Sequence, residues 1–260
     1  MKRRHLVVLG LAAATPFARA RTAPVTIGVL PGPHAEILAQ VQAVAAGRGL
    51  VLQTVERESG RQINADVLAG RLDVACFQDG VAFAGEPSRR RDALVELART
   101  VTLPVAIYSR RVAAVRQLPR GASIAIPRER AAAARALVLL HNHGLIELRH
   151  DSGLAATPRD VTGNRYALRL VPTDTARLAA ALHGMDAAVI DRDTAGAAGL
   201  QPGRDSIGLE DGRSPWSDVM AIRAADRDAP WAAELLAAYR SEPVKRFLLE
   251  RFQDSVRRPW

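Results

Sequence analysis

Cysteine is the scarcest feature of this sequence, because its 260 residues include only Cys76. A single cysteine excludes an intramolecular disulfide. Cys76 lies in an apolar run, DVACF, that is typical of a strand, so we expect a buried structural thiol rather than a reactive one. His141 and His143 lie near the end of a predicted helix and point in different directions, so neither a metal site nor another cofactor is expected.

Aromatic residues are also few, at 4% of the chain. Beyond residue 20, basic residues are spread along the chain, and their only cluster is Arg89-Arg90-Arg91. Without aromatic rings on which bases stack, such a distribution does not favour single-stranded nucleic acid. We therefore expect no nucleic-acid partner.

Long hydrophobic runs are absent, since the apolar stretch at 6–14 is too short to span a membrane permanently. It follows a basic head at 2–5 and precedes Ala18-Arg19-Ala20, which has the small residues that signal peptidase requires. Residues 1–20 are therefore predicted to be a signal peptide cleaved after Ala20. No cysteine adjoins this point, so no lipid anchor is expected. The arginine pair at 3–4 leaves both Sec and twin-arginine export open.

Removal of residues 1–20 changes the charge balance of the chain. The signal peptide contains four basic residues and no acidic ones, which leaves 32 basic against 27 acidic residues and lowers the net charge from +9 to +5. Much of the basicity therefore belongs to targeting. The remaining chain of about 240 residues is long enough for one large or two small domains, each with its own core.

The stretch at 25–38, VTIGVLPGPHAEIL, predicts a strand, a tight loop and a helix in succession. Val25, Ile27 and Val29 alternate as in a short buried strand, and the proline-rich turn at 31–33 ends it. Free N–H groups at the helix start would face the carboxyl end of the strand, where open α/β sheets bind ligands. An ordinary strand–helix connection without a ligand is the alternative interpretation.

The rest of the chain repeats this alternation, which is typical of an α/β fold with largely parallel sheets. Gly144 is expected to end the longest helix as its C-cap residue. The expected strands lie near 51–55, 72–77, 94–102, 106–109, 123–126, 166–171, 187–190 and 219–222, and the helices near 62–68, 130–143, 175–182, 231–239 and 244–252.

Several stretches also match one known family in the same order and at the same spacing. They include GVLPGPHAEIL at 28–38, LAGRLDVACFQ at 68–78, LPVAIYSRR at 103–111, DAAVIDRDTAGAAGL at 186–200 and SPWSDVMAIR at 214–223. From Val25 to the C-terminus the chain resembles the methionine-binding lipoproteins of bacterial ABC importers, the methionine-binding/lipoprotein-28 family of substrate-binding proteins.

The resemblance implies an α/β, two-lobed periplasmic-binding-protein (type II) fold with a cleft between the lobes. Lobe one is expected at 24–104 plus 222–260, and lobe two at 107–219. The implied function is capture of a small amino-acid-like ligand in the periplasm and its delivery to an ABC permease driven by its ATPase. The implied protein is a monomer that performs no covalent chemistry.

The resemblance also implies which residues contact the ligand. Arg135 matches an arginine of the methionine-binding relatives, and its guanidinium is expected to hold the α-carboxylate of a ligand. Phe77, Gln78 and Asn64 match as well, and Phe77 belongs either to the side-chain pocket or to the core.

Other expected binding positions depart from the family. Gly60 and Ala82 replace tyrosines, so the aromatic wall that clasps a thioether is largely missing. The remaining replacements are Asp79 for histidine, Val81 for proline, Asp191 and Asp218 for asparagines, and Trp216 for tyrosine.

These replacements have a physical direction, because buried carboxylates need positive partners. If Asp79, Asp191 and Asp218 all face the cleft, the ligand carries more positive charge than methionine, as in a cationic amino acid or a short peptide. Methionine or a close analogue is the second possibility. The third is that these carboxylates pair with nearby arginines, and that the site is altered or lost.

Two other classes of function remain as alternatives. An enzyme would need a nucleophile and a base. Cys76 and His34 are the only candidates for such a pair, and nothing in the sequence indicates that they lie close together. A non-transport protein that senses a solute for a membrane partner would use the same two lobes. The sequence gives no feature that separates this second class from a transport protein.

Overall fold

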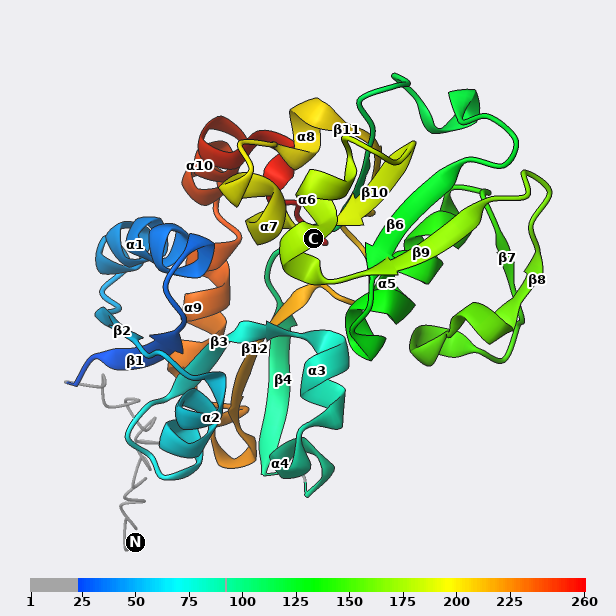
Figure 1. Ribbon diagram of the computed structural model, residues 1–260. Helices are drawn as coiled ribbons and strands as arrows, with labels where there is room; N and C mark the ends of the chain where they lie inside the picture. The colour runs from blue at the N-terminus through cyan, green and yellow to red at the C-terminus, as the bar shows by residue number, and fades with distance from the viewer. Residues whose placement is uncertain (1–22, 92) are drawn as a thin grey trace, which may run out of the picture.

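The computed structural model describes residues 23–91 and 93–260, and it places them in two lobes, each built on its own five-stranded sheet (Figure 1). The predicted signal peptide, 1–20, lies outside the described residues. Among the helices of the described part, none has the length and apolar character needed to cross a membrane.

The first sheet has the strand order β2-β1-β3-β12-β4. Strand β1 pairs in parallel with β2 and β3, whereas β12 runs antiparallel to both β3 and β4. The strands are β1 (Val25–Val29), β2 (Leu52–Glu56), β3 (Val74–Asp79), β4 (Leu94–Arg99) and β12 (Asp218–Arg223).

The second sheet has the order β11-β5-β10-β6-β9, and a separate two-stranded sheet, β7-β8, lies beside it. Strand β6 pairs in parallel with β9 and β10, and β5 is antiparallel to β10 and β11. The strands are β5 (Ala106–Tyr108), β6 (Ser123–Pro127), β7 (Glu147–Leu148), β8 (Val161–Gly163), β9 (Arg169–Thr173), β10 (Ala187–Ile190) and β11 (Ser206–Leu209).

Helices cover both faces of each sheet, so each lobe has a core on either side of its strands. In the first lobe α1, α9 and α10 pack on one face and α2 and α3 on the other. In the second lobe α5 covers one face, and α6 and α7 the other. The helices are α1 (Pro33–Ala46), α2 (Gly60–Leu68), α3 (Gly80–Gly85), α4 (Pro87–Arg90), α5 (Arg130–Asn142), α6 (Leu178–Ala181), α7 (Arg192–Ala197), α8 (Pro202–Asp205), α9 (Pro230–Tyr239) and α10 (Glu242–Phe252).

The expected α/β alternation is confirmed, but the expectation of largely parallel sheets is wrong in part. Strands β5 and β12 run antiparallel to their neighbours in the two sheets. Each is the first strand after the chain passes from one lobe into the other, so it enters its sheet from the cleft side. The predicted end of α5 is confirmed, because Gly144 has a φ of +69°, which favours glycine.

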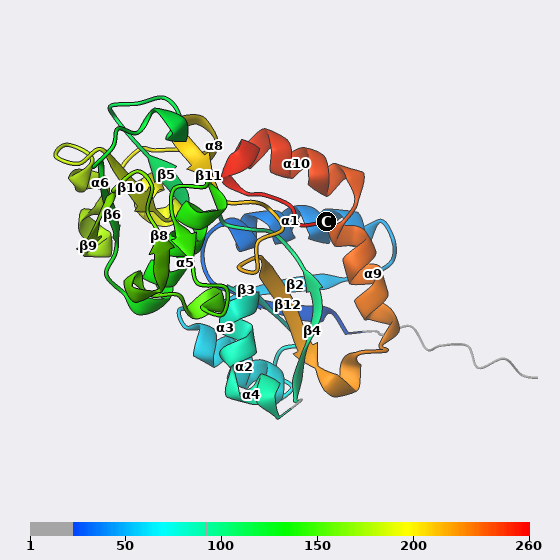
Figure 2. The same cartoon turned by 90° about the vertical axis from the view of Figure 1, so that its right-hand side faces the viewer.

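Two segments connect the lobes, 100–105 and 210–217, and we call them the crossing segments. They are hydrogen bonded to each other near both ends: Asp218 N–H donates to Val101 O at 2.7 Å, and Glu210 N–H donates to Val105 O at 3.2 Å. The last residues of the chain return to the same place (Figure 2), where Arg257 pairs with Thr102.

The expected lobe boundaries stay a prediction, although strand pairing bears on one of them. The expected division placed Asp218 and Val219 at the end of lobe two. In the structure both residues belong to β12, and they pair with Asp79 and Gln78 of β3 in the first sheet.

Candidate functional site

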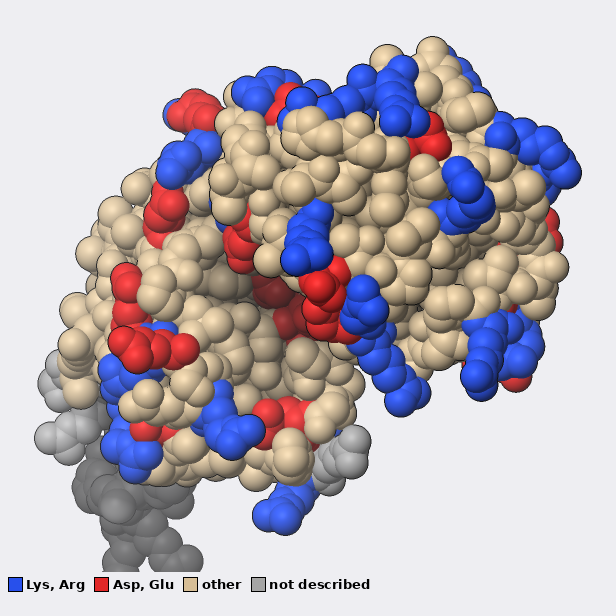
Figure 3. All heavy atoms as spheres, in the orientation of Figure 1, with Lys and Arg blue, Asp and Glu red and all other residues tan. Residues whose placement is uncertain are grey.

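A cavity of about 260 Å³ lies between the lobes at the carboxyl ends of β3, β6 and β10. This is the edge at which open α/β sheets place their ligands. Both lobes and both crossing segments contribute to its wall, and Figure 3 shows a hollow between the lobes with acidic atoms inside it. The lining residues are Asp79, Val105, Pro127, Ala131, Ala132, Arg135, Thr175, Val189, Asp191 and Trp216.

The cavity brings together four of the eight residues expected to contact a ligand. Asp79 comes from the first lobe, Arg135 and Asp191 from the second, and Trp216 from a crossing segment. The other four are not among its lining residues. They are Asn64, Phe77, Gln78 and Asp218.

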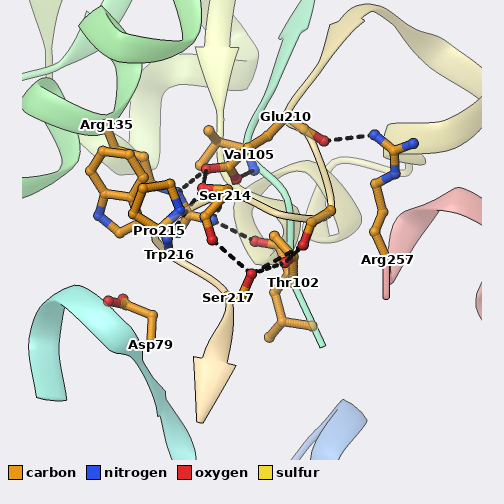
Figure 4. A network of polar contacts seen from close by, with 12 residues as sticks. Asp79, Thr102, Val105, Arg135, Glu210, Ser214, Pro215, Trp216, Ser217 and Arg257 are labelled. Atoms are coloured by element: carbon orange, nitrogen blue, oxygen red, sulfur yellow. Dashed lines mark hydrogen bonds and ion pairs between the residues drawn. The ribbon is translucent and has the colours of Figure 1, made fainter. Parts of the chain in front are cut away.

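Arg135 pairs with a carboxylate of the chain itself, Glu210, which the sequence did not predict. Glu210 accepts hydrogen bonds from Arg135 Nε at 3.1 Å and from Arg135 Nη2 at 2.6 Å, and the Leu103 carbonyl accepts a further bond from Nη2 at 2.9 Å (Figure 4). This is the two-bond geometry by which a guanidinium binds a carboxylate. The carboxylate in that geometry therefore belongs to the chain itself.

Glu210 is held in place by further donors on both crossing segments. Its carboxylate also accepts hydrogen bonds from Ser214 Oγ at 2.7 Å and from Val105 N–H at 3.1 Å, and the residue is only 6% exposed. The sequence offered one weak signal for this role, an acidic residue directly after the apolar strand that ends at Leu209.

Trp216 forms the aromatic part of the cavity wall. Its ring centroid lies 5.7 Å from the guanidinium carbon of Arg135, which is within the range of a cation–π interaction. Asp79, which belongs to the first lobe, lines the same cavity as Arg135 and Trp216 (Figure 4). A cation, an aromatic face and a carboxylate thus border one small space.

Asp79 and Asp191 have the same local role at equivalent places in the two lobes. Each stands at the carboxyl end of a strand and caps the next helix. Asp79 Oδ1 accepts from Val81 N–H and Ala82 N–H, and Asp191 Oδ1 accepts from Asp193 N–H and Thr194 N–H. Capping explains why an aspartate can replace an asparagine at position 191, because both side chains cap helices well.

The surroundings of Asp79 favour its neutral form. Burial raises the pKa of its carboxyl group most strongly, and the nearby Asp218 raises it further, whereas the helix N–H groups and Arg135 oppose this effect. The net result is a raised pKa. A carboxyl group in this position is stabilised in its charged form by a cation that enters the cavity.

Asp218 turns away from the cavity and into the core of the first lobe. Its Oδ2 lies 3.0 Å from His34 Nε2, and His34 Nδ1 lies 3.7 Å from Cys76 Sγ. Burial alone would lower the pKa of His34, but Cys76 and Asp218 favour the charged ring and raise this pKa to about 10. A buried ion pair results.

The fold brings Cys76 and His34 into contact, which nothing in the sequence predicted. The thiol is fully buried, and neither residue lines the cavity. Among the described residues, no group of histidine, cysteine and acidic side chains is arranged to hold a metal ion.

Phe77 and Gln78 of β3 contact α2, the helix that contains Asn64. Asn64 and Gln78 exchange hydrogen bonds at 3.3 and 3.4 Å. The ring of Phe77 packs against Gly60, where a Cβ atom would come within 2.1 Å of it. A side chain at position 60 would therefore have to displace the ring of Phe77.

A larger cavity, of about 490 Å³, lies outside this site. It is formed by the α7–α8 region and the end of α10, and none of the expected ligand-contacting residues lines it. Its wall includes three charged side chains: Arg192, Asp193 and Arg251.

Comparison with known proteins agrees with the sequence resemblance and with the two-lobed fold. Residues 25–260 match the family model described as NlpA lipoprotein. Outer membrane lipoprotein 2 of Mannheimia haemolytica is 31% identical over 95% of this chain and 91% of its own length.

Two solved structures are similar over nearly their whole length. A nutrient-binding protein from Burkholderia cenocepacia bound to methionine has a TM-score of 0.70 and 35% identity, covering 89% of this chain and 98% of its own. A periplasmic substrate-binding protein of an ABC transporter from Coxiella burnetii has a TM-score of 0.72 and 31% identity, covering 90% and 99%. The expected two-lobed periplasmic-binding-protein fold is confirmed.

Proposed function

The chain belongs to the NlpA lipoprotein family, and from this membership we propose that it is a substrate-binding protein of an ABC importer. In this role it captures a small amino-acid-like ligand between its lobes and delivers the ligand to a membrane permease that an ATPase drives. The similarity to an ABC-transporter substrate-binding protein of Coxiella burnetii supports the proposal.

The observation that carries this proposal is the composition of the cavity wall. Asp79 belongs to one lobe, Asp191 to the other, and Val105 and Trp216 to the two crossing segments. A ligand in this space touches every part that moves when the lobes rotate about the crossing segments. It therefore stabilises the closed form by its differential affinity for that form.

The ligand is proposed to be methionine or a more cationic amino acid or short peptide. Methionine is supported by the Burkholderia cenocepacia relative, which is bound to methionine. A more cationic ligand is supported by the two carboxylates in the wall, Asp79 and Asp191. The site is proposed to perform no covalent chemistry, consistent with the complete burial of Cys76.

The proposed location follows from the predicted signal peptide. We place the protein in the periplasm, as a monomer whose partners are the permease and its ATPase. Its relative in Mannheimia haemolytica is named an outer membrane lipoprotein. The absence of a lipid anchor stays a prediction from the sequence.

A ligand-binding experiment on residues 21–260 tests the function. The protein is unfolded and refolded to remove carried-over ligand, and its melting temperature is measured with methionine, lysine, arginine, ornithine and short peptides. A ligand at about one hundred times its dissociation constant adds about 2.7 kcal/mol to the free energy of unfolding. Small-angle scattering measures whether the same ligand makes the protein more compact.

Two matched variants locate the response in the cleft. Ala131 and Ala39 are both exposed helical alanines, but only Ala131 lines the cavity. Ala131→Trp is expected to abolish the ligand-induced shift, and Ala39→Trp to preserve it. Equal loss in both variants, or no response to any ligand, would contradict the proposed function.

A further inference from the structure

Glu210 is buried at the start of the crossing segment 210–217, where its side chain pairs with Arg135 of the cavity wall. Glu210 fills the Nε–Nη2 edge of Arg135, with distances of 3.1 and 2.6 Å to its two oxygens. A ligand carboxylate that uses the same two nitrogens would have to displace a carboxylate of the chain. The side chains of Arg135 and Glu210 are only 16% and 7% exposed.

Displacement of Glu210 is unfavourable, because its two oxygens accept four hydrogen bonds. Besides the two from Arg135, they receive one from Ser214 Oγ and one from Val105 N–H. A carboxylate that is buried without its positive partner is strongly destabilising. We therefore expect the pair to persist when a ligand is bound.

The pair also leaves two acidic side chains as the other titratable groups of the cavity wall. The positive charge of Arg135 is compensated by Glu210, while Asp79 and Asp191 line the same 260 Å³ space. In the described part of the chain, both hydrogen bonds to Asp79 end on Oδ1, so Oδ2 receives none. A second carboxylate brought in by a ligand meets like charge, and an amine meets opposite charge.

We infer that Glu210 is a specificity-determining residue, because it occupies the Nε–Nη2 edge of Arg135 and compensates its charge, so that the cleft prefers a cationic amine to a ligand carboxylate. This inference rests on the proposed function, and it narrows the ligand class. The preferred ligands are amines in which the α-carboxylate is absent or masked, such as amino-acid amides. A free amino acid of the same side chain binds more weakly.

The test compares acids with amides in the unaltered protein. Residues 21–260 are titrated with arginine and argininamide, lysine and lysinamide, and methionine and methioninamide, by calorimetry at pH 7. We expect each amide to bind at least about tenfold more tightly than its acid, which is the size of effect that one charge-assisted hydrogen bond supports. A ratio of one or less would overturn the inference.

Charge-neutral variants assign the preference to Glu210. Glu210→Gln frees the charge of Arg135 for a ligand carboxylate, and it should shift the amide-to-acid ratio by about tenfold or more toward the acid. Glu86→Gln makes the same charge change outside the cavity, beside Asn64, and should leave the ratio unchanged. A purely structural role of Glu210 would weaken both ligands of a pair equally, which would overturn the inference.

A further variant keeps the test independent of whether Glu210→Gln folds. Asp79→Asn preserves the helix cap and does not touch the ion pair, and it should lower the affinity for the amides by about tenfold. An unchanged affinity would overturn the inference. If the unaltered protein binds these ligands but prefers the acids, the proposed function stands and the inference is wrong. If it binds none of the six ligands, both are contradicted.

Discussion

The stretch from Glu210 to Asp218 has a buried carboxylate at each end, and the two have different partners. Glu210 pairs with Arg135 of α5 in the second lobe, and Asp218 pairs with His34 of α1 in the first. Each end of this crossing segment is thus fixed by an ion pair to a different lobe. An ion pair with a buried carboxylate therefore holds both ends of the stretch from Glu210 to Asp218.

The two pairs differ in what lies next to them. The Arg135–Glu210 pair borders the cavity together with the ring of Trp216, whereas neither His34 nor Asp218 lines it. Only one member of these two pairs, Arg135, lines the cavity, so the Arg135–Glu210 pair is the one expected to act on ligand choice. The His34–Asp218 pair is expected to act mainly on stability.

The largest effect is expected from Glu210→Ala, which breaks the cavity-side pair. It leaves Arg135 without a carboxylate in a largely buried position and should lower the free energy of unfolding by about 3–5 kcal/mol. Urea unfolding measures this change. Glu96→Ala removes the partly exposed pair with Arg99 and is the control, with an expected effect below about 1 kcal/mol. Similar effects of the two variants would contradict the burial argument.

The second prediction breaks the other pair with Asp218→Asn. At pH 6 the variant should lose about 1.5–3 kcal/mol, because a hydrogen bond between two charged groups becomes one with a neutral amide. The amide-to-acid ratio should change much less than in Glu210→Gln, because Asp218 does not line the cavity. An equal change of this ratio in the two variants would remove the distinction between the two pairs.

The pH dependence of this loss has a definite sign. The pKa of His34 is raised from 6.5 to about 10 in the folded protein, so its contribution to stability is complete below pH 6.5 and declines as the pH rises toward 10. The penalty of Asp218→Asn should therefore shrink between pH 6 and pH 10. Cys76 faces the same ring, so the series is repeated in Cys76→Ala. A penalty that grows with pH would contradict the assignment.

The third prediction concerns the middle of the crossing segments, between the two pairs. Thr102 Oγ1 donates to the Gly212 carbonyl at 2.6 Å and lies 2.8 Å from Ser217 Oγ. Thr102→Val keeps the shape and removes both bonds, so a loss of about 2 kcal/mol is expected, near 1 kcal/mol for each bond. Thr162→Val, at an exposed threonine, should be close to neutral. Equal effects would mean that the hydroxyl of Thr102 has no role.

The smallest effect is expected at Trp260, which contacts the crossing segment 100–105. Trp260 Nε1 donates to the Thr100 carbonyl, and its ring packs edge-on against Tyr239. Trp260→Phe preserves the ring contact and loses the bond, so about 1 kcal/mol and a fall in melting temperature of about 2–4 °C are expected. Calorimetry measures the fall, and Trp260→Ala should exceed it. No difference between the two variants would show that the ring contributes nothing.

Local patterns predicted the elements of the fold better than the direction of its strands. Alternation and helical spacing found β1, β10, α5 and α9 within one or two residues. The reversed direction of β5 and β12 left no local trace, because it depends on the lobe from which each strand enters. The short helices α3 and α7 were also missed, since six residues are too few for a period to show.

Four of the residues expected from the family resemblance line the cavity, and two of them stand at the carboxyl end of a strand. Asp79 is the last residue of β3, and Asp191 follows β10 directly. Asp218 also borders a strand, but it begins β12 instead of ending it, and its side chain reaches the core. Glu210 was missed because its partner lies 75 positions away in the chain.

The sequence by itself determined the alternating elements, the family membership and the segment that is predicted to direct export, because these depend on local patterns and on motifs in a fixed order. The tertiary structure alone decided the partners of the buried charges. His34 and Asp218 are 184 positions apart, and Cys76 and His34 are 42 apart. Charges that leave water must find partners in space, and only the folded chain fixes which groups become neighbours.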